Sequence, residues 1–435
     1  MSFLQDILQV IIAPHKAFKQ IITNPKYLGA LIILLLFMGV QIGYEYVQFS
    51  RTYTEQTFPI IFFNGPELIN EFPTFTNASA WTGGSNVNLT NSNDYFNYSV
   101  YLAGSGIPPT SSAGYFSIFG NTSLQMDASN TNNIKATLSN ISNVDCSATG
   151  FQNISMTIKQ VSPQTALQSA TLTLYSLAET NSYTYDLTSR LSSLSTLDQW
   201  NNLTIPIGPN AQGWSISGDP IWSNITSLVL NFNYLSDSNV TIRIGALFFR
   251  GEYLTPVQYG SLGLVIQFLQ VFSLQFAFTW FVLTALIYAF CRVLKNAVLW
   301  KPIFVAIGLA MVVMVIRALV NLAAAATLQT AYYPFDISLG VRFDQFATLY
   351  FPPEAVNSLS VASQNASLII DTSTSAFRGI VTVMAFISYI WLGALVVYAL
   401  GALKPEFSLG KRIALAVAGI VITTIFVVPL LVGVV

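Results

Sequence analysis

Charged residues are scarce in this chain of 435 residues. They make up 9% of the sequence, and the formal net charge is −1. Because no basic excess is present to neutralise a phosphate backbone, nucleic acid is not expected as a partner. Hydrophobic residues account for 53% of the chain, which is the balance expected when about half of a protein lies in lipid.

Histidine and cysteine are scarcer still. His15 is the only histidine, which excludes a Ser-His-Asp triad and a His-based metal site, and no phosphate-binding G-x-x-x-x-G-K-[ST] loop occurs. Cys146 and Cys291 fall on opposite sides of the predicted membrane, so they form no disulfide. The carboxylates that a glycan hydrolase would need are scattered over predicted turns. The sequence therefore predicts a non-enzymatic protein without a cofactor.

Long apolar runs are the dominant feature of the chain. They cover residues 28–48, 260–291, 302–328, 376–402 and 411–434. Each is long enough to cross a hydrocarbon core of ~30 Å at ~1.5 Å rise per residue. The runs predict a polytopic α-helical membrane domain with five transmembrane helices. Residues 1–27 carry an apolar stripe and are expected to lie at the cytoplasmic interface.

Basic residues in the short loops predict the orientation. They fall on one side of the five spans, which should be the cytoplasm: Lys16, Lys19, Lys26, Arg292, Lys295, Lys301, Lys404, Lys411 and Arg412. Residues 52–258, the second loop 329–375 and the C-terminus are then extracellular. All candidate N-glycosylation sequons lie on that outer side: Asn77, Asn88, Asn97, Asn121, Asn140, Asn153, Asn202, Asn224, Asn239 and Asn365.

The large outer segment, 52–258, reads as β-rich. Candidate strands are 58–63, 95–102, 133–139, 154–160, 171–176, 203–207, 227–234 and 240–249. In the run 228–234 the apolar residues Leu228, Leu230, Phe232 and Tyr234 alternate and share one face. Short strands without intervening helices predict an all-β jelly-roll sandwich.

Residues 200–251 resemble the last strands of galactose-binding-like and carbohydrate-binding jelly rolls. The match runs through Trp200-Asn-Asn-Leu, Trp222-Ser-Asn-Ile and the strand ending Ile244-Gly-Ala-Leu-Phe-Phe. Gly245 stands where those domains usually have Asp, so their ion site is not carried over. The resemblance implies glycan binding on exposed aromatic platforms, for which Trp81 and Trp214 are the candidates, while Trp200 and Trp222 are expected in the core.

The membrane segments resemble a second family. The opening Pro14-His-Lys-Ala-Phe18, followed by Asn24-Pro25 and the first span, and the turn Phe407-Ser-Leu-Gly-Lys-Arg412 are similar to the prokaryotic and archaeal branch of the Yip family, which has five spans. The resemblance implies a membrane-organising or trafficking-like role. The acidic motif of eukaryotic members is absent, so binding of Rab GTPases is not implied.

Polar residues inside the spans mark a further candidate site. Arg317 and Glu45 both fall in the outer halves of their spans and form a candidate intramembrane pair. The alternative is ordinary hydrogen bonding between helices, with an arginine that extends toward the headgroups.

The leading hypothesis is an envelope protein that displays a ligand- or glycan-binding domain. Its partners would be the lipid bilayer and surface glycans or other envelope proteins. The alternatives are a transporter or permease component with an extracellular substrate-binding domain, and a cell-surface glycan hydrolase.

The orientation gives a direct prediction. In a background that lacks Cys146 and Cys291, the variant Ser142→Cys should react with a membrane-impermeant maleimide on intact cells. Ser408→Cys should react only after permeabilisation, because position 408 lies in a basic loop predicted to be cytoplasmic. Labelling of position 408 but not of position 142 on intact cells would reverse the orientation.

Overall fold

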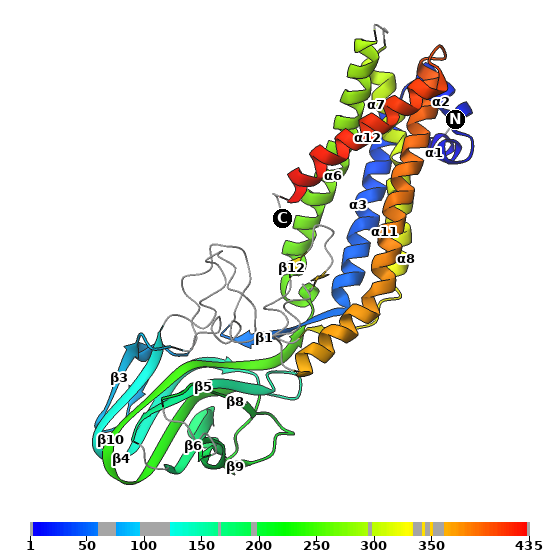
Figure 1. Ribbon diagram of the computed structural model, residues 1–435. Coiled ribbons are helices and arrows are strands. Elements are labelled where there is room, and N and C mark those ends of the chain that lie inside the picture. The colour runs from blue at the N-terminus through cyan, green and yellow to red at the C-terminus, as the bar shows by residue number, and fades with distance from the viewer. Residues whose placement is uncertain are drawn as a thin grey trace.

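The computed structural model describes residues 3–59, 75–95, 122–163, 167–192, 198–294, 298–333, 342–343, 349–350 and 361–432. A helical bundle and an antiparallel β domain lie end to end (Figure 1). The predicted combination of apolar helices with a large antiparallel β domain is therefore confirmed.

The described helices of the bundle range from 10 residues in the shortest to 43 residues in the longest. Their bounds are α1 Phe3–Ile12, α2 Pro14–Thr23, α3 Tyr27–Ser50, α6 Pro256–Val293, α7 Trp300–Ala310, α8 Val312–Ala325, α11 Val361–Leu403 and α12 Leu409–Val432. Within the described residues, four stretches are long and apolar enough to cross a membrane: Tyr27–Ser50, Val265–Val293, Trp300–Ala325 and Thr374–Leu403. They match the first four predicted spans. Helix α12 covers the fifth predicted span, and its crossing of a membrane stays a prediction.

The continuous stretch of α7 and α8 is the centre of the bundle. In its most apolar stretch of 18 residues, 78% of the residues are buried inside the protein. The corresponding shares are 22% in Thr374–Leu403 and 28% in α3. Large apolar side chains of the surrounding helices, such as Leu35, Phe386 and Ile390, point outward and are exposed. Apolar surface of this extent is the surface that helices present to lipid.

A glycine lets the central helix approach its neighbours closely. A Cβ added at Gly308 would lie 2.6 Å from the Cβ of Ala30 and 2.6 Å from the Trp280 ring. Trp280 cannot easily move aside, because its indole N–H donates to the Phe304 carbonyl at 2.7 Å and its ring stacks on Phe304 at 4.2 Å between centroids. Close packing of α3, α6 and α7 thus depends on this position.

The β domain is built on two long strands. Strand bounds are β1 Thr52–Phe58, β2 Trp81–Gly83, β3 Val87–Ser92, β4 Ser123–Val144, β5 Asn153–Ser162, β6 Leu167–Ser176, β7 Ala178–Asp186, β8 Asn201–Pro206, β9 Trp214–Ser217, β10 Ile225–Leu254 and β11 Ala331–Tyr333. A short helix, α5 (Thr188–Ser192), follows β7, and the strands Arg342–Phe343 and Leu349–Tyr350 form a separate pair.

The two halves of β4 and β10 belong to different layers. In the first layer, the N-terminal half of β4 and the C-terminal half of β10 combine with β3, β5 and β8. In the second layer, the opposite halves combine with β2, β6, β7 and β9. Leu230 and Phe232 from one half of β10 and Ile242 and Ile244 from the other join a single buried cluster. The layers therefore face each other across one core, as in a β-sandwich.

Alternation predicted the core strands well and the polar strands poorly. Leu228, Leu230, Phe232 and Tyr234 are all buried, as predicted, but 227–234 and 240–249 are parts of one strand. The predicted strands 58–63 and 95–102 lie largely outside the described residues. Strands β1, β3 and β7 were not predicted because their sequences are mostly polar. In β1, Glu55 is buried only because Arg250 of β10 pairs with it at 2.8 Å.

Three helices pass into strands of the β domain with little intervening chain. Helix α3 meets β1 at Arg51, β10 meets α6 at Thr255, and α8 leads to β11, which pairs in parallel with β1. Thr255 caps α6 reciprocally, since its backbone N–H donates to the Gln258 side chain at 2.7 Å. The backbone pairing of β1 with β11 therefore joins the chain after α3 to the chain after α8 and holds the β domain against the bundle.

Gly308→Ala should destabilise the bundle by about 1–3 kcal/mol, because the new methyl group overlaps Ala30 and Trp280. The matched control is Gly39→Ala, since a Cβ at Gly39 of α3 has nothing within 4 Å. Helix propensity alone would make either change favourable by up to ~1 kcal/mol. Thermal unfolding of the full chain in detergent measures both, and equal stability of the two variants would contradict the close approach at Gly308.

Candidate functional site

Polar side chains line the outer face of the first layer. Alternation in β10 puts Ile242 and Ile244 in the core and Thr241 and Arg243 on the opposite face. The strand register places Arg243 beside Gln125 of β4 on one side and beside Lys159 of β5 on the other. One row thus crosses three strands and carries two cations on a sheet face.

These side chains form a continuous network, which we call the charged ladder: Asp198, Lys159, Asp94, Arg243, Gln125, Asp127 and Thr241. The Lys159 ammonium lies 2.8 Å from a carboxylate oxygen of Asp94 and 2.8 Å from one of Asp198. Arg243 pairs with the same Asp94 oxygen, and its Nε donates to the Gln125 side chain at 2.7 Å. Gln125 and Thr241 then each donate to Asp127 at 2.7 Å.

The members of the ladder differ in exposure. The Lys159 side chain is only 10% exposed, whereas that of Asp198 is 67% exposed. Burial opposes ionisation of Asp94, but hydrogen bonds and charges from Lys159 and Arg243 outweigh it and lower the pKa of Asp94. Burial likewise opposes the charge of Lys159, but its bonds to Asp198 and Asp94 raise its pKa. Asp94 and Lys159 are therefore both charged at neutral pH.

An aromatic ring flanks the ladder. The Lys159 ammonium lies 5.8 Å from the centroid of the Trp200 ring, and Trp200 is half-buried at the start of β8. Sequence reasoning expected Trp200 in the core and missed the ladder. The available signal was Lys159 and Arg243 at non-core positions of apolar strands. A ring beside fixed hydrogen-bonding groups is the arrangement that recognises sugars.

The two predicted aromatic platforms lie elsewhere. Trp81 is 6% exposed and its indole N–H donates to the Phe75 carbonyl at 2.7 Å, so its ring belongs to the core and has no face for a sugar. Trp214 is half-buried in an aromatic cluster with Tyr185 and Trp222, at 5.2 and 5.4 Å between ring centroids. Its indole N–H donates to the Pro206 carbonyl. Neither tryptophan joins the charged ladder.

The sequons differ in accessibility. Asn77, Asn88, Asn202 and Asn239 are exposed, and Asn153 and Asn224 are partly buried. Only the backbone of Asn140 and Asn365 is described, and Asn97 and Asn121 lie outside the described residues. Glycosylation at these positions stays a prediction.

The intramembrane pair of Arg317 and Glu45 is not formed within the described part of the chain. Glu45 is 2% exposed, and one of its oxygens accepts from Gln41 at 3.4 Å. Helix α3 runs parallel to the continuous stretch of α7 and α8, with Gly29 facing Leu309 of α7 and Gly43 facing Leu322 of α8. This register puts Arg317 level with Met38, about 10 Å from the level of Glu45 at ~1.5 Å per residue. The sequence prediction assumed equal depth for the two residues.

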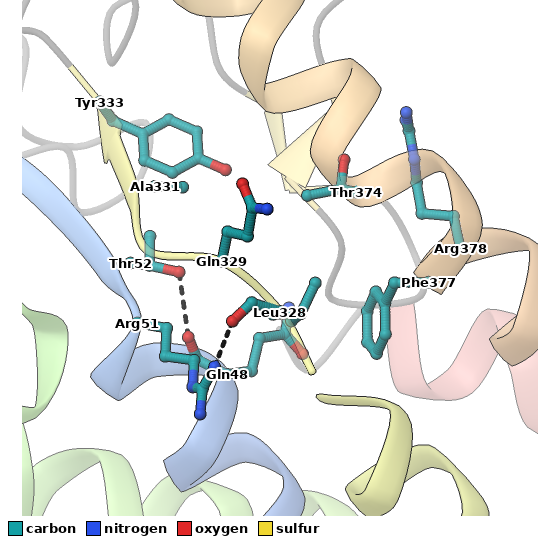
Figure 2. Close-up of a pocket in the computed structure, with 10 residues that line it drawn as sticks. All are labelled: Gln48, Arg51, Thr52, Leu328, Gln329, Ala331, Tyr333, Thr374, Phe377 and Arg378. Atoms are coloured by element: carbon teal, nitrogen blue, oxygen red, sulfur yellow. Dashed lines mark hydrogen bonds between the residues drawn. The ribbon is translucent and has the colours of Figure 1, made fainter. Parts of the chain in front are cut away.

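A small cavity lies where the bundle meets the β domain (Figure 2). Its volume is about 40 Å³, and it is partly open to solvent. Its lining residues come from the end of α3, the start of β1, the segment after α8, β11 and α11: Gln48, Arg51, Thr52, Leu328, Gln329, Ala331, Tyr333, Thr374, Phe377 and Arg378.

Hydrogen bonds of the cavity lining connect the end of α3 to the segment after α8. Arg51 donates to the Leu328 carbonyl, and the hydroxyl of Thr52 donates to the Gln48 carbonyl at 3.1 Å. The Arg378 guanidinium points away from that of Arg51 (Figure 2), so the two cations do not converge on one anion. Burial raises the pKa of the Tyr333 phenol to about 12, and the phenol remains protonated. The cavity is too small for a sugar. The hydrogen bond from Arg51 joins the end of α3 to the chain after α8.

Comparison of the sequence with protein-family models gives no match, and comparison with curated proteins gives none. Among solved structures, the chain is similar to a family 11 carbohydrate-binding module from Clostridium thermocellum in complex with a β-1,3-1,4-mixed-linked tetrasaccharide. The identity is 13% over 41% of this chain and 92% of that chain, and the TM-score is 0.24.

Two enzymes give similar values over smaller parts of their own length. An arabinose-bound GH51 α-L-arabinofuranosidase matches at 14% identity over 46% of this chain and 30% of that chain, with a TM-score of 0.26. An exo-β-agarase matches at 9% identity over 40% and 24%, with a TM-score of 0.27. Similarity at these TM-scores assigns neither a ligand nor a reaction to this chain.

The charged ladder predicts a pH-dependent stability. Because the folded pKa of Asp94 is lowered, its contribution is present above the unfolded value of about 3.9 and is lost as the pH falls through the folded pKa. Asp94→Asn should therefore lower the unfolding free energy at pH 7 by about 1–2 kcal/mol, a value reduced by solvent screening. Below about pH 3 the difference from the unmodified chain should shrink.

The matched control is Asp219→Asn, which alters an exposed carboxylate of the loop after β9. Thermal unfolding of the full chain in detergent, followed across this pH range, separates the two variants. A loss in Asp94→Asn that is constant with pH, or equal to that of Asp219→Asn, would show that the ladder is not held by ionised Asp94.

Proposed function

We propose that this protein is a non-enzymatic membrane component of the cell envelope that binds a neutral glycan on the charged ladder of its β domain. The observation that carries the proposal is the continuous ladder from Asp198 to Thr241 beside the Trp200 ring. The helical bundle anchors this face at the outer surface of the membrane.

The chemistry of the ladder suits sugar hydroxyls. A hydroxyl both donates and accepts, so it needs neighbouring acceptors and donors at fixed positions. Asp127 and Asp198 offer carboxylate oxygens, while Arg243 and Gln125 offer N–H groups whose geometry is set by their mutual bonds. Two cations stand among three carboxylates, so the ladder has no positive excess to attract an acidic polymer. These features favour a neutral sugar chain.

The arrangement of the bundle supports the membrane anchor. Helix α2 and the ends of α6, α7 and α12 that carry basic residues lie at the end of the bundle away from the β domain (Figure 1), as expected when that end is cytoplasmic. These basic residues include Lys16 and Lys19 of α2, Arg292 of α6, Lys301 of α7 and Lys411 of α12. Five spans, an outer β domain of jelly-roll type and an outer C-terminus remain part of this proposal.

The resemblance to the Yip family adds a role for the bundle. Helices α1 and α2 are contributed by the segment that carries this resemblance, and Phe18 and Ile21 of α2 pack in the bundle core. An organising role in the membrane, with the β domain binding surface glycans, combines the two resemblances.

A permease is the second candidate. It is favoured by Glu45, whose second carboxylate oxygen has no hydrogen-bond partner within the described residues although it is buried in a span. Uptake of a solute by proteoliposomes, abolished by Glu45→Gln, would establish transport. Binding of glycan without any uptake would favour the leading proposal.

Trp200→Ala and Gln125→Ala should each weaken glycan binding at least about tenfold, which corresponds to ~1.4 kcal/mol. Both remove a group at the ladder without leaving a charge unpaired. The matched control is Thr184→Ala, which removes a hydroxyl from the second layer, where Thr184 bonds to Thr173 at 3.1 Å. Binding of the full chain in nanodiscs to neutral and acidic oligosaccharides is measured by calorimetry. Failure to bind any neutral sugar, or equal affinity of Trp200→Ala and Thr184→Ala, would refute the proposed function.

A further inference from the structure

The carboxyl group of Glu45 is buried inside the bundle, in the half of α3 that lies nearer the β domain. Glu45 is 2% exposed. It comes five residues before Ser50, the last residue of α3, and 18 residues after Tyr27, the first. At ~1.5 Å rise per residue it is about 8 Å from one end of the helix and about 27 Å from the other. A carboxylate ion at such a position costs free energy unless cations or several donors surround it.

Glu45 has few groups that could stabilise a negative charge. Its Oε1 accepts from the Gln41 side chain at 3.4 Å, and its Oε2 has no hydrogen-bond partner in the described structure. Among the described residues, no cation forms an ion pair with it. A neutral carboxyl group is much less costly to bury than a carboxylate, so this environment favours the protonated form.

A second buried glutamate in the same chain has the partner that Glu45 lacks. Glu55 of β1 is 8% exposed, and its two oxygens accept from Arg250 at 2.8 and 2.9 Å. A bidentate guanidinium of this kind stabilises the ionised form of a buried carboxylate. The contrast indicates that Glu55 is held as an ion and Glu45 as a neutral acid.

Ionisable groups on the elements packed against α3 do not replace the missing partner. Arg317 of α8 is about 10 Å from the level of Glu45 at ~1.5 Å per residue. Arg378 of α11 follows Phe377, whose ring stacks on that of Tyr44 at 6.2 Å, but no bond from Arg378 to Glu45 is formed. Arg51 donates to the Leu328 carbonyl. The other ionisable side chains described on α1, α6, α7 and α11 lie nearer the opposite end of the bundle (Figure 1): Asp6, Tyr288, Cys291, Arg292, Lys301, Tyr389 and Tyr398.

The surroundings of Glu45 suit a proton better than a metal cation. Hard metal cations take about six oxygen ligands, whereas here an N–H group of Gln41 is directed at the carboxyl group. In the register of α3 with α8, Asn321 is level with Gln41, and its buried Oδ1 also has no hydrogen-bond partner in the described structure. Acceptors without donors at neighbouring levels indicate a region that is short of donors, and a proton on Glu45 supplies one.

We infer that Glu45 is a proton-binding site of the bundle, whose carboxyl group exchanges its proton with the outer solution. The outer end of α3 is the nearer one, and Gln48, one turn beyond Glu45, lines the partly open cavity at that end (Figure 2). The inference rests on the membrane placement under the proposed function and is independent of glycan binding. It also names the ion to which a permease, the second candidate, would couple transport.

The test uses dicyclohexylcarbodiimide, a lipid-soluble reagent that modifies protonated carboxyl groups within membranes. Intact cells that carry the full chain are treated, and modification of Glu45 is measured by mass spectrometry. Modification should be at least about tenfold greater in medium at about pH 6 than at about pH 9. Gln41→Lys should reduce it at least about tenfold at pH 6, because a cation one turn away pairs with the carboxylate. The matched control is Gln41→Leu, which adds no charge and should keep the modification.

Each outcome decides the inference. Absence of modification in the unmodified chain, or equal modification in Gln41→Lys and Gln41→Leu, would overturn it. Protection by sodium chloride but not by choline chloride would also overturn it, because the site would then hold a metal cation. Modification that follows the cytoplasmic pH, set with an ionophore, would overturn exchange with the outer solution. A chain that does not remain with lipid in a flotation gradient would instead refute the membrane placement, while unchanged glycan affinity in Glu45→Gln would separate this site from the ladder.

Discussion

The need to pair every backbone polar group where the helices end controls how the two halves of this molecule are joined. A helix pairs its own backbone in lipid, but a loop at its end does not. Here α3 continues into β1 and β10 into α6 with a single residue between them, and β11 pairs with β1 immediately after α8. The Thr255 cap and the Arg51 bond to the Leu328 carbonyl provide partners for groups at the boundary. The position of the β domain relative to the bundle follows from these bonds.

The bundle has its own organising element. Helices α7 and α8 are surrounded, so their side chains must be apolar and small where neighbours approach, as at Gly308. A polar side chain in this central stretch is surrounded mostly by other side chains of the protein. Asn321 of α8 and Glu45 of α3 are both buried and each retains an oxygen without a hydrogen-bond partner in the described structure. Such groups cost free energy in a bundle core, so they are the positions at which a functional role is expected.

Local patterns predicted the elements and not the contacts between them. The apolar runs predicted the long helices, and the alternation of Leu228, Leu230 and Phe232 predicted a core strand. The charged ladder was not predictable, because its members come from segments far apart in sequence and each is ordinary by itself. Only the register that puts Arg243 between Gln125 and Lys159 brings them together. The depth of Arg317 likewise depends on a helix register that residue counting does not supply. Trp81 is covered because β2 pairs with β4, which no local pattern shows.

The direct passage of β10 into α6 has a consequence for how this protein would search for a ligand. Arg243 and Thr255 lie on one unbroken stretch of chain, at most about 40 Å apart at ~3.3 Å per residue. Under the proposed membrane placement, a β domain joined in this way cannot sweep a volume as a domain on a flexible linker does, and it samples only a thin layer of space parallel to the bilayer. Encounters then depend on lateral diffusion of the whole protein. A repeating polymer that lies within that layer would bind several copies of the protein at once. The resulting avidity would exceed the affinity of any single β domain.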